Sequence, residues 1–429
     1  MKRRIVVGLV AAVLAASGLR AQTVPEGSQA AAVEPGYRRT PVFRIDPFNN
    51  LRIPHWGFVF SVGGTAANNA VNLKDFGALI FLSDEDSLRW VDGLDALGLV
   101  PQGSGLDGNG EGQAGVYVGG PIGRRLHLGL SLMGRSYGAL SLDDDAVVLL
   151  RDGNASREEF TLGDSNGEGL ASGEAGIHGL YRLGPLGSVD GVHIILGAGA
   201  RYIRPVLYGS AHSVISNGGF VRVNGDSISA SIEIETYQTP GLLDGDVKLN
   251  QGGGIIGDFL ARAEWPTSGF ALEAMLANVG AVSVAGVERR SASVSLETTD
   301  LNEVGDVLDT LELALQDTTN ITITLPRIAR FAASAWANRI LQLDLIATFP
   351  FGSEFDLPAT VDVWSSWRFI PTVPIRAGLV FGGHQGVGFS AGLGVETRNF
   401  FFGVAGRSLG GLFSNATGAS ARLDLGVFF

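Results

Sequence analysis

The sequence predicts an all-β protein: a transmembrane antiparallel up-and-down β-barrel of about 14 strands, with an N-terminal plug or loop region and two short helices. Three observations support this fold class. The chain begins with an export-type segment, apolar residues alternate with polar or small ones over many stretches, and the last such stretch ends at Phe429. The alternating stretches are about ten residues long, which is the length that a tilted strand needs to cross a bilayer.

Residues 1–21 are typical of a secretory signal peptide. A basic start, Met1-Lys2-Arg3-Arg4, precedes the apolar run from Ile5 to Leu19, and we expect cleavage near Ala21. The run is too short and too rich in Ala and Gly for a lasting span, because a spanning helix needs about 20 apolar residues. The segment therefore predicts export, and with the barrel pattern it predicts an outer-membrane location.

The charge balance argues against a nucleic-acid partner. Removing residues 1–21 takes away four of the 31 basic residues and no acidic residue, which leaves 27 against 43 and a net charge of −16. Binding to phosphates needs a basic surface instead. Cysteine is absent, which excludes a lipidated cysteine, a disulfide framework and a thiolate metal site.

Hydropathy points to a sheet that closes on itself. The mean hydropathy is +0.23, yet after residue 21 no stretch approaches 18 uninterrupted apolar residues, so helical spans are not expected. A hydrophobic chain without spanning helices can lie in lipid only if a closed sheet pairs all of its backbone N–H and C=O groups.

The period of two is clearest near the C-terminus. There, Val387, Phe389, Ala391, Leu393 and Val395 alternate with small or polar residues, so one face suits lipid and the other a lumen or plug. Strands are predicted near 55–63, 113–121, 125–134, 145–151, 170–183, 190–208, 226–238, 253–266, 269–279, 281–297, 321–337, 339–350, 357–370, 374–382, 386–397, 399–407 and 419–429. Some of these segments would merge or form hairpins outside the membrane. We expect about 14 strands, with 12 or 16 compatible with an even-numbered barrel.

The end of the chain carries the candidate site residues. Leu423, Leu425, Val427 and Phe429 form one apolar face of a final strand, and this pattern resembles the signal by which the outer-membrane assembly machinery recognises its clients. The expected partners are therefore that machinery, outer-membrane lipid and lipopolysaccharide. Aromatic residues near strand ends suit interfacial girdles, although any one of them could instead pack a plug: Trp56, Trp265, Trp336, Trp364, Trp367 and Phe400–Phe402.

Two segments have helical rather than strand spacing. Ser83 and the acids after it would cap a helix near 83–98, and apolar residues from Val304 to Leu315 predict another near 301–316. A helix in a barrel protein must lie in a loop, at the rim or inside the lumen. We place the first helix, with residues 22–54 and 101–112, in an N-terminal plug or loop region, and the second in an excursion between strands. The expected domains are an N-terminal extension or hatch over 22–54 and a barrel over 55–429. Either helix could also be a rim helix in the membrane interface.

A family resemblance extends over roughly the last hundred residues. The stretch from Pro374 to Phe400, with Phe381-Gly382-Gly383 and Gly392-Leu393-Gly394, resembles the C-terminal hairpins of barrels related to the long-chain fatty-acid outer-membrane transporters, closest to a subgroup of uncharacterised function. Thr324-Leu325-Pro326-Arg327 is similar to a Leu-Pro strand start common in that superfamily. Those transporters have an Asn-Pro-Ala motif in their hatch, whereas the nearest stretch here is Ile45-Asp46-Pro47-Phe48-Asn49.

The resemblance implies a monomeric barrel obstructed by an N-terminal hatch, with a pocket for a hydrophobic ligand and an exit through the wall. It therefore predicts uptake of hydrophobic small molecules such as fatty acids. The alternative is a scaffold or anchor that holds a secreted or periplasmic partner and transports nothing.

The search for chemistry predicts no catalytic, cofactor or metal site, and hence a protein that is not an enzyme. The six histidines are scattered without metal-ligand spacing, and no Gly-x-Ser-x-Gly elbow occurs. The acidic runs Asp143-Asp144-Asp145, 107–111 and 164–168 lack the full calcium-loop pattern and predict solvated turns. A membrane lipase would need a Ser/His pair within hydrogen-bond reach.

Overall fold

The computed structural model describes residues 46–52, 55–72, 98, 100–101, 103–152, 158–163, 165–186, 191–213, 219–224, 227–242, 248–249, 251–299, 313–338, 340–353, 355, 357–383, 386–411 and 415–429. The predicted signal peptide, residues 22–45 and residues 83–97 of the first predicted helix lie outside this set. Most of the described chain is strand, as predicted.

The elements follow one another in a simple order. They are α2 (Pro47–Leu51), β1 (Gly57–Asn68), β2 (Leu106–Pro121), β3 (Leu126–Leu142), α5 (Asp144–Asp152), β4 (Glu159–Thr161), β5 (Asn166–Leu186), β6 (Val192–Ser213), β7 (Phe220–Asn224), β8 (Ser227–Gln238), β9 (Gln251–Trp265), β10 (Phe270–Gly280), β11 (Val282–Thr298), β12 (Ala314–Ile323), β13 (Arg327–Trp336), β14 (Leu341–Phe351), β15 (Thr360–Ile370), β16 (Val373–Gly382), β17 (Val387–Glu396), β18 (Phe400–Leu409) and β19 (Gly418–Phe428).

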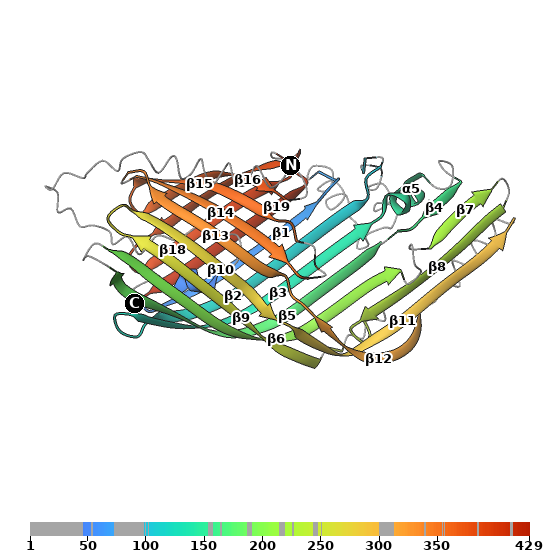
Figure 1. The fold of residues 1–429 in the computed structure, drawn as a ribbon, viewed down its shortest axis with the longest axis horizontal. Coiled ribbons are helices and arrows are strands. Elements are labelled where there is room, and N and C mark those ends of the chain that lie inside the picture. The colour runs from blue at the N-terminus through green and yellow to red at the C-terminus, as the bar shows by residue number, and fades with distance from the viewer. Residues whose placement is uncertain are drawn as a thin grey trace, which may run out of the picture.

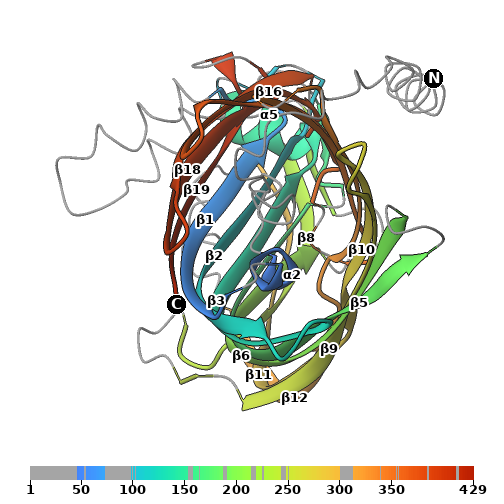
Figure 2. The ribbon, with the colours of Figure 1, turned by 90° about the vertical axis from the view of Figure 1, so that its left-hand side faces the viewer.

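The sheet closes into a barrel because β1 pairs antiparallel with β2 on one side and with β19 on the other. From β2 the circuit of antiparallel pairings runs through β3, β5, β6, β9, β10, β13, β14, β15, β16, β17, β18 and β19 back to β1. Figure 2 shows this ring from its end, with α2 inside it. The predicted closed antiparallel barrel is confirmed.

The strand count differs from the predicted value of about 14. Of the 19 strands in the described part of the chain, β4, β7 and β8 lie outside the barrel and 16 form it. The count rises because two tracks of the wall are split, β10 continuing into β11 and β12 into β13. A register shift between Leu276 and Val279 marks the first break. The circuit above names one strand of each split track, β10 and β13, and the strands β11 and β12 raise the count from fourteen to 16. In Figure 1, β7, β8, β11 and β12 extend beyond the barrel on the right.

Three predicted assignments are wrong. Residues 101–112 were placed in a plug or loop region, but from Leu106 onward they belong to β2 and pair with β3 in the barrel wall. The strand expected at 145–151 is helix α5, where the Asp143 carboxylate accepts a hydrogen bond from the backbone N–H of Asp145 at 3.0 Å and Val147 is fully buried. An acidic cap and apolar residues at helical spacing outweigh the short β-branched run. The second helix was expected to reach residue 316, but Ala314 and Leu315 pair with β11 and belong to β12; residues 301–312 lie outside the described chain.

The two faces of the wall differ as the alternation predicts. Large apolar side chains face outward, including Leu130 and Leu132, each 62% exposed, whereas their neighbours Ser131 and Met133 are buried in the lumen. The girdle prediction is wrong for Trp364, which is 1% exposed and packs inside the barrel against Ala332 and Ile346. No helix among the described residues is long and apolar enough to cross a membrane.

The two ends of the barrel are unequal. Residues 122–125, 266–269, 371–372 and 397–399 are tight connections at one end, here called the short-turn end. At the other, the long-loop end, consecutive strands are joined by longer stretches such as 69–105 and 143–165. This asymmetry is typical of outer-membrane barrels, whose short turns face the periplasm.

Candidate functional site: a lumenal cavity

A short N-terminal segment, residues 46–52, lies inside the barrel and is called the lumenal segment below (Figure 2). Its helix α2 begins at Pro47, whose fixed φ suits a first helical position. The Asp46 carboxylate accepts hydrogen bonds from the backbone N–H groups of Phe48, at 2.9 Å, and Asn49, at 3.3 Å. This capping supplies partners for two N–H groups that a helix start leaves unpaired, so five residues hold a helical turn within the lumen.

Glycines on the wall make room for this segment. A Cβ added at Gly197 would lie 3.1 Å from Cδ1 of Phe48, and one added at Gly129 would lie 3.1 Å from Cδ2 of Leu51. Phe48 and Leu51 are both fully buried in a cluster with wall residues near the short-turn end. Burying each of these two side chains stabilises the packing of the lumenal segment against the wall by about 1.5–3 kcal/mol.

Ion pairs tie both ends of the lumenal segment to the wall. The Arg330 guanidinium, on β13, donates to Asp46 at 2.5 Å and to Glu273, on β10, at 2.7 Å. Glu273 also accepts from Arg52 and, at 3.1 Å, from Arg262. The side chains of Arg52, Glu273 and Arg330 are at most 8% exposed. Removing one partner from such a group leaves a buried charge without compensation.

A second charged cluster lies in the lumen and is centred on Arg201. Arg201, on β6, donates to Asp258 at 2.7 and 2.9 Å and to the side-chain oxygen of Asn278 at 2.5 Å, and it also bonds Glu174. Asn278 has a positive φ of 61° and donates from its side chain to the carbonyl of Pro326 at 2.7 Å. The cluster therefore fixes the break between β10 and β11 and joins it to the start of β13.

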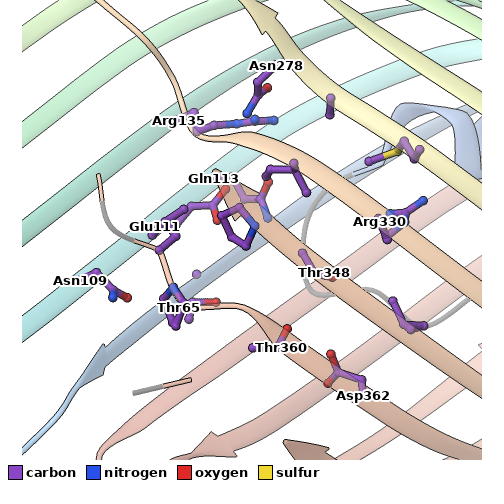
Figure 3. Close-up of a pocket in the computed structure, with 18 of the residues that line it drawn as sticks. Thr65, Asn109, Glu111, Gln113, Arg135, Asn278, Arg330, Thr348, Thr360 and Asp362 are labelled. Atoms are coloured by element: carbon purple, nitrogen blue, oxygen red, sulfur yellow. The ribbon is translucent and has the colours of Figure 1, made fainter. Parts of the chain in front are cut away.

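A cavity of about 110 Å³ lies on the long-loop side of the lumenal segment, and its walls differ in polarity. Polar side chains from β1, β2 and β3 form one side, and Figure 3 shows Thr65, Asn109, Glu111, Gln113 and Arg135 there. On the other side, β13, β14 and the residues before β15 contribute the apolar residues Ile328, Ile346, Pro350, Leu357 and Pro358, among the polar side chains of Arg330, Thr348, Thr360 and Asp362. Such a cavity suits a compact, mainly apolar molecule that carries a small polar group.

Charges around the cavity are paired within the protein. Arg407 donates to both carboxylate oxygens of Asp362, at 3.0 and 3.1 Å, while Arg201 and Arg330 are held by the acids described above. The lumen therefore presents balanced charge instead of a field of one sign, and a single-sign field is what would concentrate ions of the opposite sign.

An apolar cluster packs beside the cavity, toward the long-loop end of β3, β5, β6 and β9. Tyr137 from β3 and Phe355, between β14 and β15, have ring centres 5.5 Å apart and are 3% and 2% exposed. The side chains packed with them, all at most 9% exposed, are Leu170, Ile203, Tyr208, Ile256, Val282, Val284, Val287, Ile323, Leu325 and Leu357. Leu357 belongs both to this cluster and to the lining of the cavity, so the cluster forms part of the cavity wall.

The predicted site residues lie away from the cavity. Leu423, Leu425, Val427 and Phe429 are on or just after β19, facing outward, with Leu425 and Val427 opposite Phe60 and Phe58 of β1. Their position on the strand that closes the barrel is compatible with an assembly signal, and that role stays a prediction. The residues that do line the lumen were missed, although an isolated charge inside an apolar strand pattern, as at Arg330 or Asp258, was an available signal.

Few of the residues considered as catalytic or metal-binding candidates lie close together in the described structure. His178 is buried 3.6 Å from the Asp258 carboxylate and edge-on to Phe48. The nearby Ser131 hydroxyl has no hydrogen-bond partner within the described structure, so it forms no nucleophile–base pair with His178. In the same part of the chain no group of three or more His, Cys, Asp or Glu could hold a metal ion. His384 lies outside the described residues.

Comparison with solved structures finds proteins described as toluene transporters, monoaromatic hydrocarbon channels, a FadL homologue and an autotransporter translocator domain. The toluene transporter TodX of P. putida is 8% identical, with 87% of this chain and 90% of that chain covered and a TM-score of 0.47. A FadL homologue of Pseudomonas aeruginosa is 14% identical, with 92% and 98% covered and a TM-score of 0.46. A TodX mutant, a monoaromatic hydrocarbon channel, is 10% identical, with 89% and 92% covered and a TM-score of 0.49.

These likenesses are too weak to transfer a function to this chain. No family model matches it, and no curated protein matches it. The fold itself, a closed antiparallel barrel with an N-terminal segment inside, is the one that the resemblance to long-chain fatty-acid transporter-like barrels led us to expect, and it rests on the strand pairings of this chain.

Proposed function

We propose that this protein is an outer-membrane barrel that takes up small hydrophobic molecules. The observation that carries the proposal is a cavity with a partly apolar lining, held inside a barrel whose outer surface is apolar. An apolar solute gains free energy on leaving water for such a cavity. The short turns would face the periplasm and the long loops the outside.

Size narrows the class of ligand. A cavity of about 110 Å³ is smaller than the roughly 150 Å³ apolar cavity that binds a benzene-sized molecule. A compact hydrocarbon or short amphipathic molecule therefore fits with small shifts of side chains. A long-chain fatty acid requires the lumenal segment or the apolar cluster to move, and we place it second.

A solute that passes directly toward the periplasm would displace the lumenal segment, since Phe48 and Leu51 pack against the wall near the short-turn end. We therefore assign this segment the role of a hatch, which belongs to the proposal. Lipopolysaccharide and the outer-membrane assembly machinery remain proposed partners on the outside of the barrel.

Binding to the purified full-length protein tests the proposal. Thermal unfolding is measured with toluene, with a long-chain fatty acid and with glucose as a polar control. Toluene is expected to raise the melting temperature in a dose-dependent way, because a ligand that binds only the folded state stabilises it by mass action, and glucose is expected to have no effect. A deletion strain should take up labelled toluene more slowly than its complemented parent.

The opposite results would reject uptake. If no apolar ligand stabilises the protein and the deletion strain takes up toluene normally, the scaffold or anchor function becomes the better account. That alternative predicts a specific periplasmic or secreted protein that co-purifies with the barrel after crosslinking and is lost with an unrelated barrel as bait.

A further inference from the structure

Arg135, on β3, has an unused hydrogen-bond donor beside the cavity. Its guanidinium donates to the Tyr137 hydroxyl at 3.1 Å, and its Nε lies 3.5 Å from a carboxylate oxygen of Glu174. Within the described structure this Nε has no hydrogen-bond acceptor, although Arg135 is only 6% exposed. Arg201, by contrast, donates four hydrogen bonds to neighbouring side chains. A buried donor without an acceptor is costly, so an acceptor supplied by a ligand would stabilise it.

Strand register places two more polar side chains next to Arg135. Gln113, on β2, is directly opposite Arg135, and Glu111 is directly opposite Tyr137. Residues that are opposite, or two apart along a strand, point to the same face of the sheet. Glu111, Gln113 and Arg135 therefore line the same side of the cavity (Figure 3), and we call them the polar corner. A ligand oxygen placed there meets a guanidinium donor, and a ligand hydroxyl also meets carboxylate and amide acceptors.

The charges around the polar corner disfavour a negatively charged ligand. Arg135 contacts Glu174, and Arg201 contacts Glu174 and Asp258, so with Glu111 two guanidinium groups already face three carboxylates. A ligand carboxylate would add a fourth negative charge and would lose its hydration on burial. An uncharged hydroxyl or carbonyl oxygen accepts the same hydrogen bond without bringing a charge.

We propose that the cavity selects compact, uncharged molecules that carry a hydroxyl or carbonyl group, such as phenols, over hydrocarbons and carboxylates of the same size. Arg135 is the residue that determines this specificity. Its guanidinium donates to the ligand oxygen, while the apolar body of the ligand lies against Ile328, Ile346 and Leu357 on the other side. The inference rests on the proposed uptake function and narrows its substrate class.

Three one-ring compounds separate the possible ligand classes: toluene, phenol and benzoate. Their dissociation constants from the full-length protein in detergent are measured by isothermal titration calorimetry at neutral pH, where benzoate is charged. Benzoate is expected to bind most weakly. The main readout is the ratio of the toluene to the phenol dissociation constant. Arg135→Met should lower this ratio by about tenfold, which corresponds to one hydrogen bond to a charged group, and should change toluene binding much less.

Thr348→Val is the matched control, because it removes a hydroxyl from the other side of the cavity at nearly constant volume. It should leave the ratio unchanged. Arg135→Met is expected to fold, since Glu174 keeps its ion pair with Arg201, and heat-modifiable gel migration checks this. If Arg135→Met does not fold, Arg135→Met combined with Glu174→Gln replaces it, because removing both charges of a buried pair strands neither.

Three results would overturn the inference: an unchanged ratio in the folded Arg135 variant, an equal fall of the ratio in Thr348→Val, or tighter binding of benzoate than of phenol to the unaltered protein. If toluene binds and one of these results is found, the specificity given to Arg135 is lost and the uptake function stands. If none of the three compounds binds, the uptake function is lost together with the inference.

Discussion

Single residues decide how the lumen is held together. Glu273 is the clearest case, because one carboxylate on β10 accepts from Arg52 of the lumenal segment and from Arg262 and Arg330 of the wall. The positive charges of these arginines are balanced by the carboxylates of Glu273 and Asp46. A charged residue in the middle of an apolar strand pattern thus marks a position where ion pairs join several elements inside the barrel.

Glu273→Gln should destabilise the protein strongly. Three buried guanidinium groups would lose their shared carboxylate, and breaking a buried pair typically costs about 3–5 kcal/mol. The matched control is Glu159→Gln, which removes an exposed pair with Arg222 whose side chains are about half exposed and should cost less than about 1 kcal/mol. Urea unfolding followed by tryptophan fluorescence measures both, and equal midpoints would contradict the role given to Glu273.

Among the elements, α2 depends most on its surroundings. Five residues cannot form a stable helix alone, because the first turn is costly to nucleate. The cap at Asp46, the glycine positions on β3 and β6 and the ion pairs to β10 and β13 supply what the segment lacks. The glycine positions on the wall therefore let α2 pack closely against it near the short-turn end.

Gly197→Ala should loosen the packing of α2 against the wall. The new methyl group would lie 2.8 Å from Leu180, 3.0 Å from Leu260 and 3.1 Å from Phe48, so a neighbour must move, at a cost of about 1–3 kcal/mol. We expect larger ion conductance in planar bilayers. Gly134→Ala, which meets nothing within 4 Å, should conduct like the unaltered protein. Identical conductance of the two variants would show that α2 does not seal the lumen.

The outer surface of the whole barrel tests whether it lies in lipid. Leu130→Arg places a charge on an outward position, and at the bilayer midplane such a charge costs about 2–4 kcal/mol. Leu315→Arg is the control, because Leu315 is 57% exposed on β12, in the part that extends beyond the barrel (Figure 1). Only the first variant should unfold at lower urea concentration in lipid vesicles. Equal behaviour would contradict the lipid-facing assignment.

The alternation of residues determined much of this fold in advance. Strands such as 386–397 and 419–429 were predictable because the side-chain period of a strand is two and one face is apolar. Errors occurred where local patterns were ambiguous: Ala146-Val147-Val148 suits a short strand until the acidic cap of α5 is considered, and Ala314-Leu315 suits a helix until β11 offers backbone partners. The split of two tracks depends on Asn278 and could not be predicted from alternation.

The candidate site, in contrast, depends on distances across the barrel that no local pattern encodes. The contacts Asp46–Arg330 and Tyr137–Phe355 join residues far apart in the chain, and strand register decides which inward side chains meet. Alternation determined which face of each strand meets lipid, since that needs only neighbouring residues. Which charges pair and where the cavity lies were set by the curvature and closure of the sheet, because these place distant side chains within reach of each other.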